Sequence, residues 1–209
     1  FPLNFPADSR RTVYVRVESE DSIILPITLY SEGALSKKDH TRQYLFGIYY
    51  GIILVMIVYN LFVFVFMRER VYLYYVLTLL CLHGFFQLAL NGYAREVFHS
   101  SLAWWSRDSI AFFQGAGVLF ALFFCRDFLN IRRIAPRLSR IFYFLMAWAL
   151  VNMGIALSGS YRIAILSCVF QGTLAIIAAL TAGILSIRRR FRPARFYMTA
   201  WSVLLLGAF

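Results

Sequence analysis

Hydrophobic residues in this chain of 209 residues gather in long runs from residue 45 onward. Most of these runs approach the roughly 20 helical residues that cross a hydrocarbon core of about 30 Å. Only a helix satisfies all of its own backbone hydrogen bonds in lipid, so each run predicts a transmembrane helix. The predicted spans are Leu45–Met67, Tyr72–Leu90, Ser109–Cys125, Ile141–Leu157 and Ile163–Ile187, with a sixth that begins at Phe196.

The third, fourth and sixth runs are shorter than a full span. We expect the third helix to continue past Arg126 to Phe128, because the long side chain of an interfacial arginine reaches toward the membrane surface. The sixth run extends only about 21 Å before Phe209, at 1.5 Å per helical residue, which indicates an incomplete last helix. Phe1 in place of a starting methionine likewise indicates a segment of a longer protein.

The first 41 residues follow a different pattern. Residues 12–18 are β-rich and place Val13, Val15 and Val17 on one face, and residues 22–30 form a second β-rich run. Pro26 in the second run favours an edge strand or a bulge. Because two strands alone are not a stable unit, we expect them to end an all-β domain. We interpret residues 31–41 as the linker to the membrane region, which begins at residue 42.

Composition agrees with a membrane protein, since 61% of the residues are hydrophobic and only 15% are charged. The net charge of +11 suggests nucleic-acid binding at first sight. However, basic and acidic residues cancel before residue 45, so the whole excess lies between the most hydrophobic runs. Positive charge in that position faces a membrane surface, and we expect no nucleic-acid partner.

The basic residues also predict the orientation of the spans. The first, third and fifth loops carry two, five and five arginines, whereas the second and fourth carry two and one. Basic loops stay in the cytoplasm, so the N-terminal domain is expected outside. Trp104 and Trp105 fall in an even loop and fit the outer interface. The odd-loop arginines are Arg68, Arg70, Arg126, Arg132, Arg133, Arg137, Arg140, Arg188, Arg189, Arg190, Arg192 and Arg195.

Catalytic chemistry is poorly represented in the spans. No Asp or Glu lies within the five spans, no Lys follows Lys38, and His83 is the one histidine inside a span. The three cysteines form neither a disulfide framework nor a CxxC pair. We therefore predict no catalytic site, no cofactor and no metal site. A coupled transporter usually places an ionisable group in the membrane, but carbonyl coordination in broken helices leaves a transporter open as an alternative.

The second span carries one set of polar residues on a single face. His83, Gln87 and Asn91 are spaced i, i+4 and i+8. Three interpretations remain open: a seam of hydrogen bonds between helices, a cavity that senses a ligand or signal, and a contact with lipid headgroups. The expected partners of this stripe are Asn60, Gln114, Asn152 and Gln171.

Small residues indicate where helices approach one another closely. Gly117 and Ala121 on the third span, and Ala175, Ala179 and Gly183 on the fifth, have small-xxx-small spacing. Such stripes serve packing within one bundle or contact between two protomers, so a homodimer remains open. The arginine clusters are interpreted as topology anchors and contacts with anionic lipid, or as docking surfaces for an output domain.

A series of short motifs then resembles a known family. They are Leu45-Phe46-Gly47-Ile48-Tyr49-Tyr50-Gly51 with Asn60-Leu61-Phe62, Arg68-Glu69-Arg70-Val71-Tyr72-Leu73-Tyr74-Tyr75, Phe86-Gln87-Leu88-Ala89-Leu90-Asn91-Gly92, Arg126-Asp127-Phe128-Leu129 before Arg132-Arg133 and Pro136-Arg137-Leu138, and Arg192-Pro193-Ala194-Arg195-Phe196. In this order and spacing, residues 42–209 resemble the bacterial seven-transmembrane receptors with diverse intracellular signalling modules.

The resemblance implies a fold and a role. The fold is an all-α polytopic membrane bundle, preceded by the end of an extracellular all-β domain that binds a ligand, for which carbohydrate is one candidate class. The role is signal transduction across the bacterial cytoplasmic membrane to a cytoplasmic module such as a diguanylate cyclase or a histidine kinase. The fragment itself is then not an enzyme, and its partners are the lipid bilayer, the ligand and the signalling domain.

Overall fold

The computed structural model describes residues 30–91, 108–158 and 160–207, together with residues 12, 14, 16 and 28. The chain divides into two compact units, Phe1–Gln43 and Tyr44–Phe209. Most residues of the predicted strands over residues 12–18 and 22–30 lie outside the described residues, as do Trp104 and Trp105. The all-β domain therefore stays a prediction.

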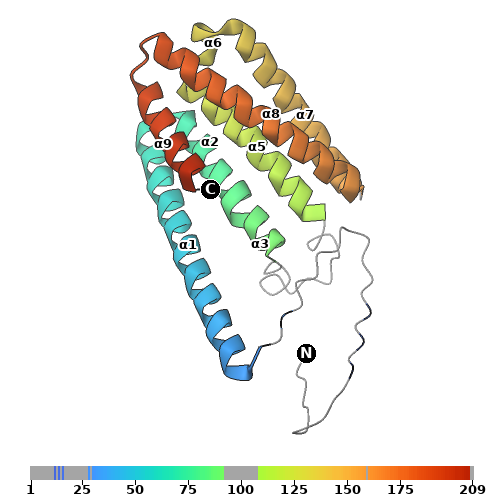
Figure 1. Cartoon of the computed structure of the whole chain (residues 1–209). Coiled ribbons are helices and arrows are strands. Elements are labelled where there is room, and N and C mark those ends of the chain that lie inside the picture. The colour runs from blue at the N-terminus through green and yellow to red at the C-terminus, as the bar shows by residue number, and fades with distance from the viewer. Residues whose placement is uncertain are drawn as a thin grey trace. The chain divides into compact units, whose positions relative to one another are not determined.

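The second unit is a bundle of antiparallel helices (Figure 1). Five of the described helical stretches are long and apolar enough to cross a membrane. The bundle confirms the predicted all-α polytopic fold. The helices are α1 (Glu32–Met67), α2 (Arg70–Thr78), the π-helix η1 (Leu79–Phe85), α3 (Phe86–Leu90), α5 (Asp108–Phe128), α6 (Ile131–Ile134), α7 (Pro136–Leu157), α8 (Tyr161–Arg188) and α9 (Pro193–Gly207).

The predicted spans agree closely with these bounds at most ends. Helix α5 ends at Phe128, as expected. Helix α1 begins at Glu32 rather than near Leu45, so most of the expected linker is helical. Its 36 residues measure about 54 Å at 1.5 Å per residue, well beyond the hydrocarbon thickness of about 30 Å. Polar residues such as Lys37 and Asp39 do not interrupt it, because they are compatible with a helix outside lipid.

The second span is not a uniform α-helix. Helices α2 and α3 are joined by seven π-helical residues, Leu79–Phe85. At its end the Phe86 N–H bonds to the Cys81 carbonyl, five residues back instead of four. The predicted polar face of this span assumes α-helical spacing, and the structure departs from that spacing over Leu79–Phe85. A wider turn of this kind is usually short and often lies at a functional position.

Three helix ends share a left-handed residue that is not glycine. Arg68, Asn130 and Arg190 have φ values of 54°, 50° and 59°, and they follow α1, α5 and α8. After α8 the Phe191 N–H bonds to the Ser186 carbonyl at 3.0 Å, and the Arg190 N–H bonds to the Ile187 carbonyl at 2.8 Å. These two bonds form a Schellman motif, which caps the last carbonyls of a helix.

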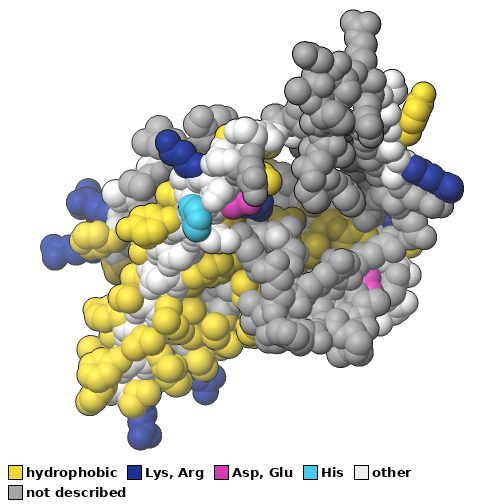
Figure 2. Space-filling view, turned by 90° about the horizontal axis from the view of Figure 1, so that it is seen from below, with side chains coloured by type: hydrophobic (Ala, Val, Ile, Leu, Met, Phe, Trp, Pro, Cys, Tyr) yellow, Lys and Arg dark blue, Asp and Glu magenta, His cyan; other side chains and the backbone are white. Residues whose placement is uncertain are grey.

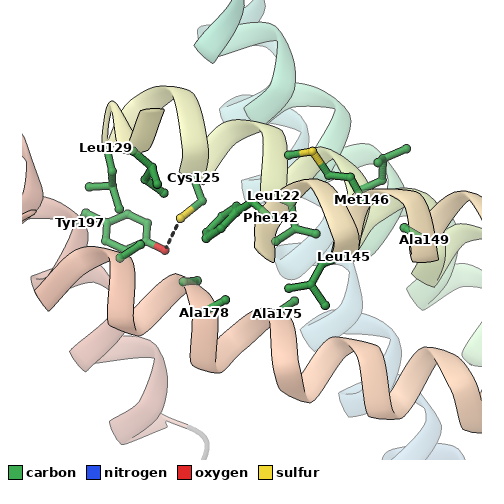
Figure 3. Packing of buried hydrophobic residues seen from close by; sticks show 14 of the residues in the cluster. Leu122, Cys125, Leu129, Phe142, Leu145, Met146, Ala149, Ala175, Ala178 and Tyr197 are labelled. Carbon is green, nitrogen blue, oxygen red and sulfur yellow. Dashed lines mark hydrogen bonds between the residues drawn. The ribbon is translucent and has the colours of Figure 1, made fainter. Parts of the chain in front are cut away.

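The main core lies between α5, α7, α8 and α9. Figure 3 shows Phe142 and Leu145 of α7 facing Ala175 and Ala178 of α8. Large side chains on one helix thus meet small ones on the next, and the two backbones come close without a gap. The buried members of this core are Leu119, Leu122, Cys125, Leu129, Ile131, Phe142, Leu145, Met146, Ala149, Ala175, Ala178, Ala179, Ala182, Ala194 and Tyr197.

The outer surface of the bundle is largely hydrophobic. Figure 2 shows a broad area of exposed hydrophobic side chains with Lys and Arg side chains at its margins. Helix α1 contributes many of them, including Val55, Phe62 and Phe66, which are 60–70% exposed. An exposed apolar area of this extent is what a lipid-facing bundle presents, because lipid replaces apolar contacts at no cost.

Candidate functional site

The candidate site consists of polar side chains that lie between the helices of the bundle. His83, in the π-helical turn, has a described hydrogen-bond partner on another helix. The Tyr49 hydroxyl of α1 lies 2.9 Å from His83 Nδ1. The hydroxyl is 34 positions away in sequence, so this bond joins the first span to the second.

Gln87 and Asn91 continue along the same span, on α3 and directly after it. Asn91 Nδ2 donates to the Gln87 backbone carbonyl at 2.8 Å and lies 3.3 Å from Gln87 Oε1. Both side chains are half-buried. The structure therefore pairs two members of the predicted stripe with each other, while the third, His83, pairs with α1.

Asn152 and Gln171 form a separate polar network between α7 and α8. Asn152 Nδ2 donates to Gln171 Oε1 at 2.8 Å, and Gln171 Nε2 donates to the Leu145 carbonyl at 2.8 Å. Ser167 Oγ donates to Asn152 Oδ1 at 2.7 Å and accepts from Trp148 Nε1 at 2.9 Å. Every member has a partner, so the network costs little to bury and fixes α7 against α8.

Three of the expected partners of the His83, Gln87 and Asn91 stripe, namely Asn60, Asn152 and Gln171, form other hydrogen bonds. Asn152 and Gln171 bind one another, and Asn60 donates within its own helix to the Met56 carbonyl at 2.8 Å. Gln114 lies half-buried on α5. Spacing along one helix identifies a polar face, but it does not identify which neighbouring helix that face meets.

Three side chains in these contacts are not among the predicted site residues, namely Tyr49, Trp148 and Ser167. A signal for two of them was present. Trp148 and Asn152 are four residues apart, as are Ser167 and Gln171, so each pair shares a helix face. Two such pairs on consecutive helices indicate a network. For Tyr49 no comparable signal exists, because tyrosine is common at membrane interfaces without a specific partner.

The predicted small-residue positions lie at close helix contacts. A methyl group on Gly117 of α5 would overlap the Leu82 side chain of η1. A methyl group on Gly183 of α8 would overlap Met198 Sδ of α9 and come within 3.2 Å of Tyr197 Cδ1. Ala175 and Ala179 are buried in the core of the same chain, and Ala121 is half-buried. Contacts within the bundle therefore use most of these positions.

Cys125 and Tyr197 add a polar contact to the hydrophobic core. The Cys125 thiol lies 3.3 Å from the Tyr197 hydroxyl, and this contact joins α5 to α9 (Figure 3). Both side chains are buried, with 3% and 8% of their surface exposed. A buried tyrosine hydroxyl needs a partner, and the thiol supplies one.

Arg126 is buried rather than directed to the membrane surface. It is 5% exposed, and its Nε donates to Asp127 Oδ1 at 2.8 Å. Its guanidinium lies 5.1 Å and 5.3 Å from the ring centroids of Phe123 and Tyr143. The expectation that this side chain reaches to the surface is wrong, because a carboxylate and two aromatic faces stabilise the charge inside.

No three His, Cys, Asp or Glu side chains come together as metal ligands in the described part of the chain. The described cysteines Cys81, Cys125 and Cys168 are all free thiols. Among the described residues, the site consists of hydrogen bonds between helices, and few charged side chains are buried in the bundle.

Comparison with known proteins gives one match. A family model described as 7TM diverse intracellular signalling matches residues 42–209. No curated protein and no solved structure matches the chain. The match covers the whole helical bundle, including every contact between helices described above.

Proposed function

Because this chain belongs to the 7TM diverse intracellular signalling family, we propose that it couples an extracytoplasmic β domain to a cytoplasmic output module. The family is one of multi-pass membrane signalling receptors, and the five apolar helices agree with it. Residues 1–41 would be the end of the β domain. The ligand class we favour is carbohydrate, and the output we favour is a diguanylate cyclase or a histidine kinase.

The orientation we propose places the N-terminus outside the cytoplasmic membrane of a bacterium. Successive spans alternate in direction, so the turns after α1, α5 and α8 share one end of the bundle. All odd-loop arginines at that end are exposed except Arg126. Exposed arginines favour the cytoplasmic side. Alkaline-phosphatase fusions test this, since a fusion at Ser160 should be active and one at Pro136 inactive. The opposite result would reverse the topology.

The observation that carries the proposed coupling is the continuity of α1. This helix starts at Glu32, in the unit that precedes the bundle, and runs unbroken to Met67. We propose that a movement at the N-terminal end of α1 reaches the second span through the contact between Tyr49 and His83.

The second span is the proposed carrier of the signal. His83 contacts α1, and Gln87 and Asn91 extend the same polar face toward the outer end. Polar contacts that exchange partners have arrangements of similar energy, and a signal selects one of them. The second span packs against α5, while the network of Asn152 and Gln171 holds α7 to α8.

A series of alanine insertions between Thr41 and Arg42 tests the coupling. Each insertion turns the preceding residues by about 100° relative to the bundle, and about 3.6 insertions complete a full turn. In the full-length receptor, basal output should change with one or two insertions and return toward the native value with four. Equal output across the series, at normal membrane abundance, would contradict signalling through α1. The matched control is the same series after Ser158, which joins α7 to α8 and should not give a helical period.

A further inference from the structure

We propose that the π-helical turn η1 changes the register of the residues that follow it in the second span by switching between π-helical and α-helical bonding. In the π-helical state the turn packs against Gly117 of α5 and bonds to Tyr49 of α1. This proposal deepens the proposed signalling function and rests on it for its effect on output. The geometry of the turn stands independently of that function.

The first observation is the hydrogen bonding of the turn. The Leu79 N–H still reaches the Tyr75 carbonyl, four residues back, in the ordinary α-helical manner. By the end of η1 the Phe86 N–H bonds to the Cys81 carbonyl, five residues back. One more residue is thus accommodated between α2 and α3 than an α-helix would hold. Such turns are less favourable than an α-helix and persist where neighbouring groups support them.

The second observation is that α5 has space for this turn. An added methyl at Gly117 would overlap the Leu82 side chain and lie 3.2 Å from the Leu82 backbone nitrogen. Leu82 is in the middle of η1, so the contact falls on the widened part of the span. The backbone nitrogen cannot rotate away as a side chain can. Glycine at position 117 therefore permits the π turn, and any larger residue there opposes it.

The third observation is a contact on the other side. His83 follows Leu82 directly, and its Nδ1 lies 2.9 Å from the Tyr49 hydroxyl. Two adjacent residues of the turn thus contact two different helices, α5 through Leu82 and α1 through His83. A shift of α1 that removes the tyrosine hydroxyl removes one of the contacts that support the turn.

The consequence lies beyond the turn. If η1 returns to α-helical bonding, every residue after it changes register by one position. Gln87 and Asn91 then rotate by about 100° and shift by about 1.5 Å along the axis. Closely packed helices adopt discrete arrangements rather than intermediate ones, so this is a two-state movement. Through this movement, a small displacement of α1 changes the direction in which Gln87 and Asn91 face at the end of α3.

Distance measurement between spin labels tests the switch in the full-length protein in lipid nanodiscs. Labels go on Leu90→Cys of α3 and Leu157→Cys of α7, whose native side chains are 56% and 62% exposed. Cys81 is changed to Ala so that the spin-label reagent does not modify it. Cys125 and Cys168 are too deeply buried to react with the reagent. Gly117→Ala should reduce the population at the native distance by about tenfold. Tyr49→Phe should shift it in the same direction by a smaller factor.

Gly172→Ala is the matched control, since a methyl there meets nothing within 4 Å. The distance distribution of this control should equal that of the native protein. An unchanged distribution in both Gly117→Ala and Tyr49→Phe, with native melting temperatures, would overturn the switch. The measurement does not use output, so a fixed second span combined with periodic output in the α1 insertion series would reject the switch and keep the proposed function.

Discussion

Asn152 Nδ2 donates a hydrogen bond of 2.8 Å to Gln171 Oε1, and both side chains are completely buried between α7 and α8. An amide in the interior of a membrane bundle has no water to bind, so its hydrogen bonds must come from the protein itself. This pair satisfies the requirement with the help of Ser167 and the Leu145 carbonyl. The contact between α7 and α8 is therefore specified by the directions of these hydrogen bonds as well as by the shapes of the packed side chains.

Asn152→Ala should destabilise the bundle by about 1–2 kcal/mol. The substitution removes two hydrogen bonds between helices, each worth about 0.6 kcal/mol on average in a membrane, and leaves Gln171 Oε1 without its donor. Asn60→Ala is the control, because Asn60 bonds only within its own helix to the Met56 carbonyl. Denaturation of the full-length protein in bicelles measures both. A loss for Asn152→Ala no greater than that for Asn60→Ala would contradict the role of the network.

Two serines of α8 should respond in opposite directions to replacement by alanine. The Ser186 hydroxyl is buried and has no hydrogen-bond partner among the described residues, so Ser186→Ala should stabilise the protein by up to about 1 kcal/mol. The Ser167 hydroxyl accepts from Trp148 and donates to Asn152, so Ser167→Ala should destabilise it by about 1 kcal/mol. Melting temperatures of the two variants measure the difference. A lower melting temperature for Ser186→Ala would contradict the prediction, because it would mean that the Ser186 hydroxyl forms a hydrogen bond in the membrane-embedded protein.

The sequence predicts the spans well because the bilayer fixes their length and composition. Every predicted run coincides with a helix, and the end of α5 at Phe128 is correct. The start of α1 at Glu32 was missed, since a helix that leaves the membrane is no longer hydrophobic and loses the signal. The π turn was missed for another reason. Its seven residues are apolar apart from His83, so they resemble any other part of a span. The glycine that leaves room for the turn, Gly117, lies on a different helix.

The candidate site was predicted in part. The polar residues of the spans were identified, because any amide or imidazole in such a run requires an explanation. Their pairing was not, since Asn152 and Gln171 bind each other instead of His83, Gln87 or Asn91. The burial of Arg126 was also missed. Its aromatic neighbour Tyr143 comes from α7, and a contact across 17 positions leaves no periodic pattern in the sequence.

Gly183→Leu should disrupt the contact between α8 and α9. Even a methyl group at position 183 overlaps Met198, and a leucine side chain must displace both Met198 and Tyr197. Overpacking of this kind costs about 1–3 kcal/mol, so the melting temperature should fall by several degrees. Gly172→Leu, on the same helix, meets open space and should leave the melting temperature unchanged or raise it. Equal effects of the two substitutions would contradict the close contact at Gly183.

Arg190→Gly should stabilise the end of α8, whereas Arg189→Gly should not. Arg190 has φ of 59°, a left-handed conformation that costs a residue with a side chain about 1 kcal/mol more than glycine. Arg189 has φ of −83°, where glycine only adds flexibility to the unfolded chain. Each variant removes one charge, so the comparison isolates the backbone. Hydrogen exchange at the Phe191 amide, which caps the helix, should slow in Arg190→Gly and accelerate in Arg189→Gly.

Gln87→Leu should change the signalling balance while leaving folding largely intact. In the described part of the chain its side chain receives a 3.3 Å contact from Asn91, whose shorter bond goes to the backbone carbonyl of residue 87 and survives the substitution. The loss of one such bond is worth about 0.6 kcal/mol in a membrane, which changes the ratio of two signalling states about threefold.

Basal output of the full-length receptor measures that ratio for Gln87→Leu and for Gln87→Ala. The control is Thr173→Leu, which also removes a polar group from a span, but one that is exposed and bonds within α8 to the Val169 carbonyl. Output should change in both Gln87 variants and stay native in the control. If the Gln87 variants reach normal abundance and signal as the native protein does, Gln87 and Asn91 serve only to pack the second span, and the path from α1 must pass through His83 to α5 instead.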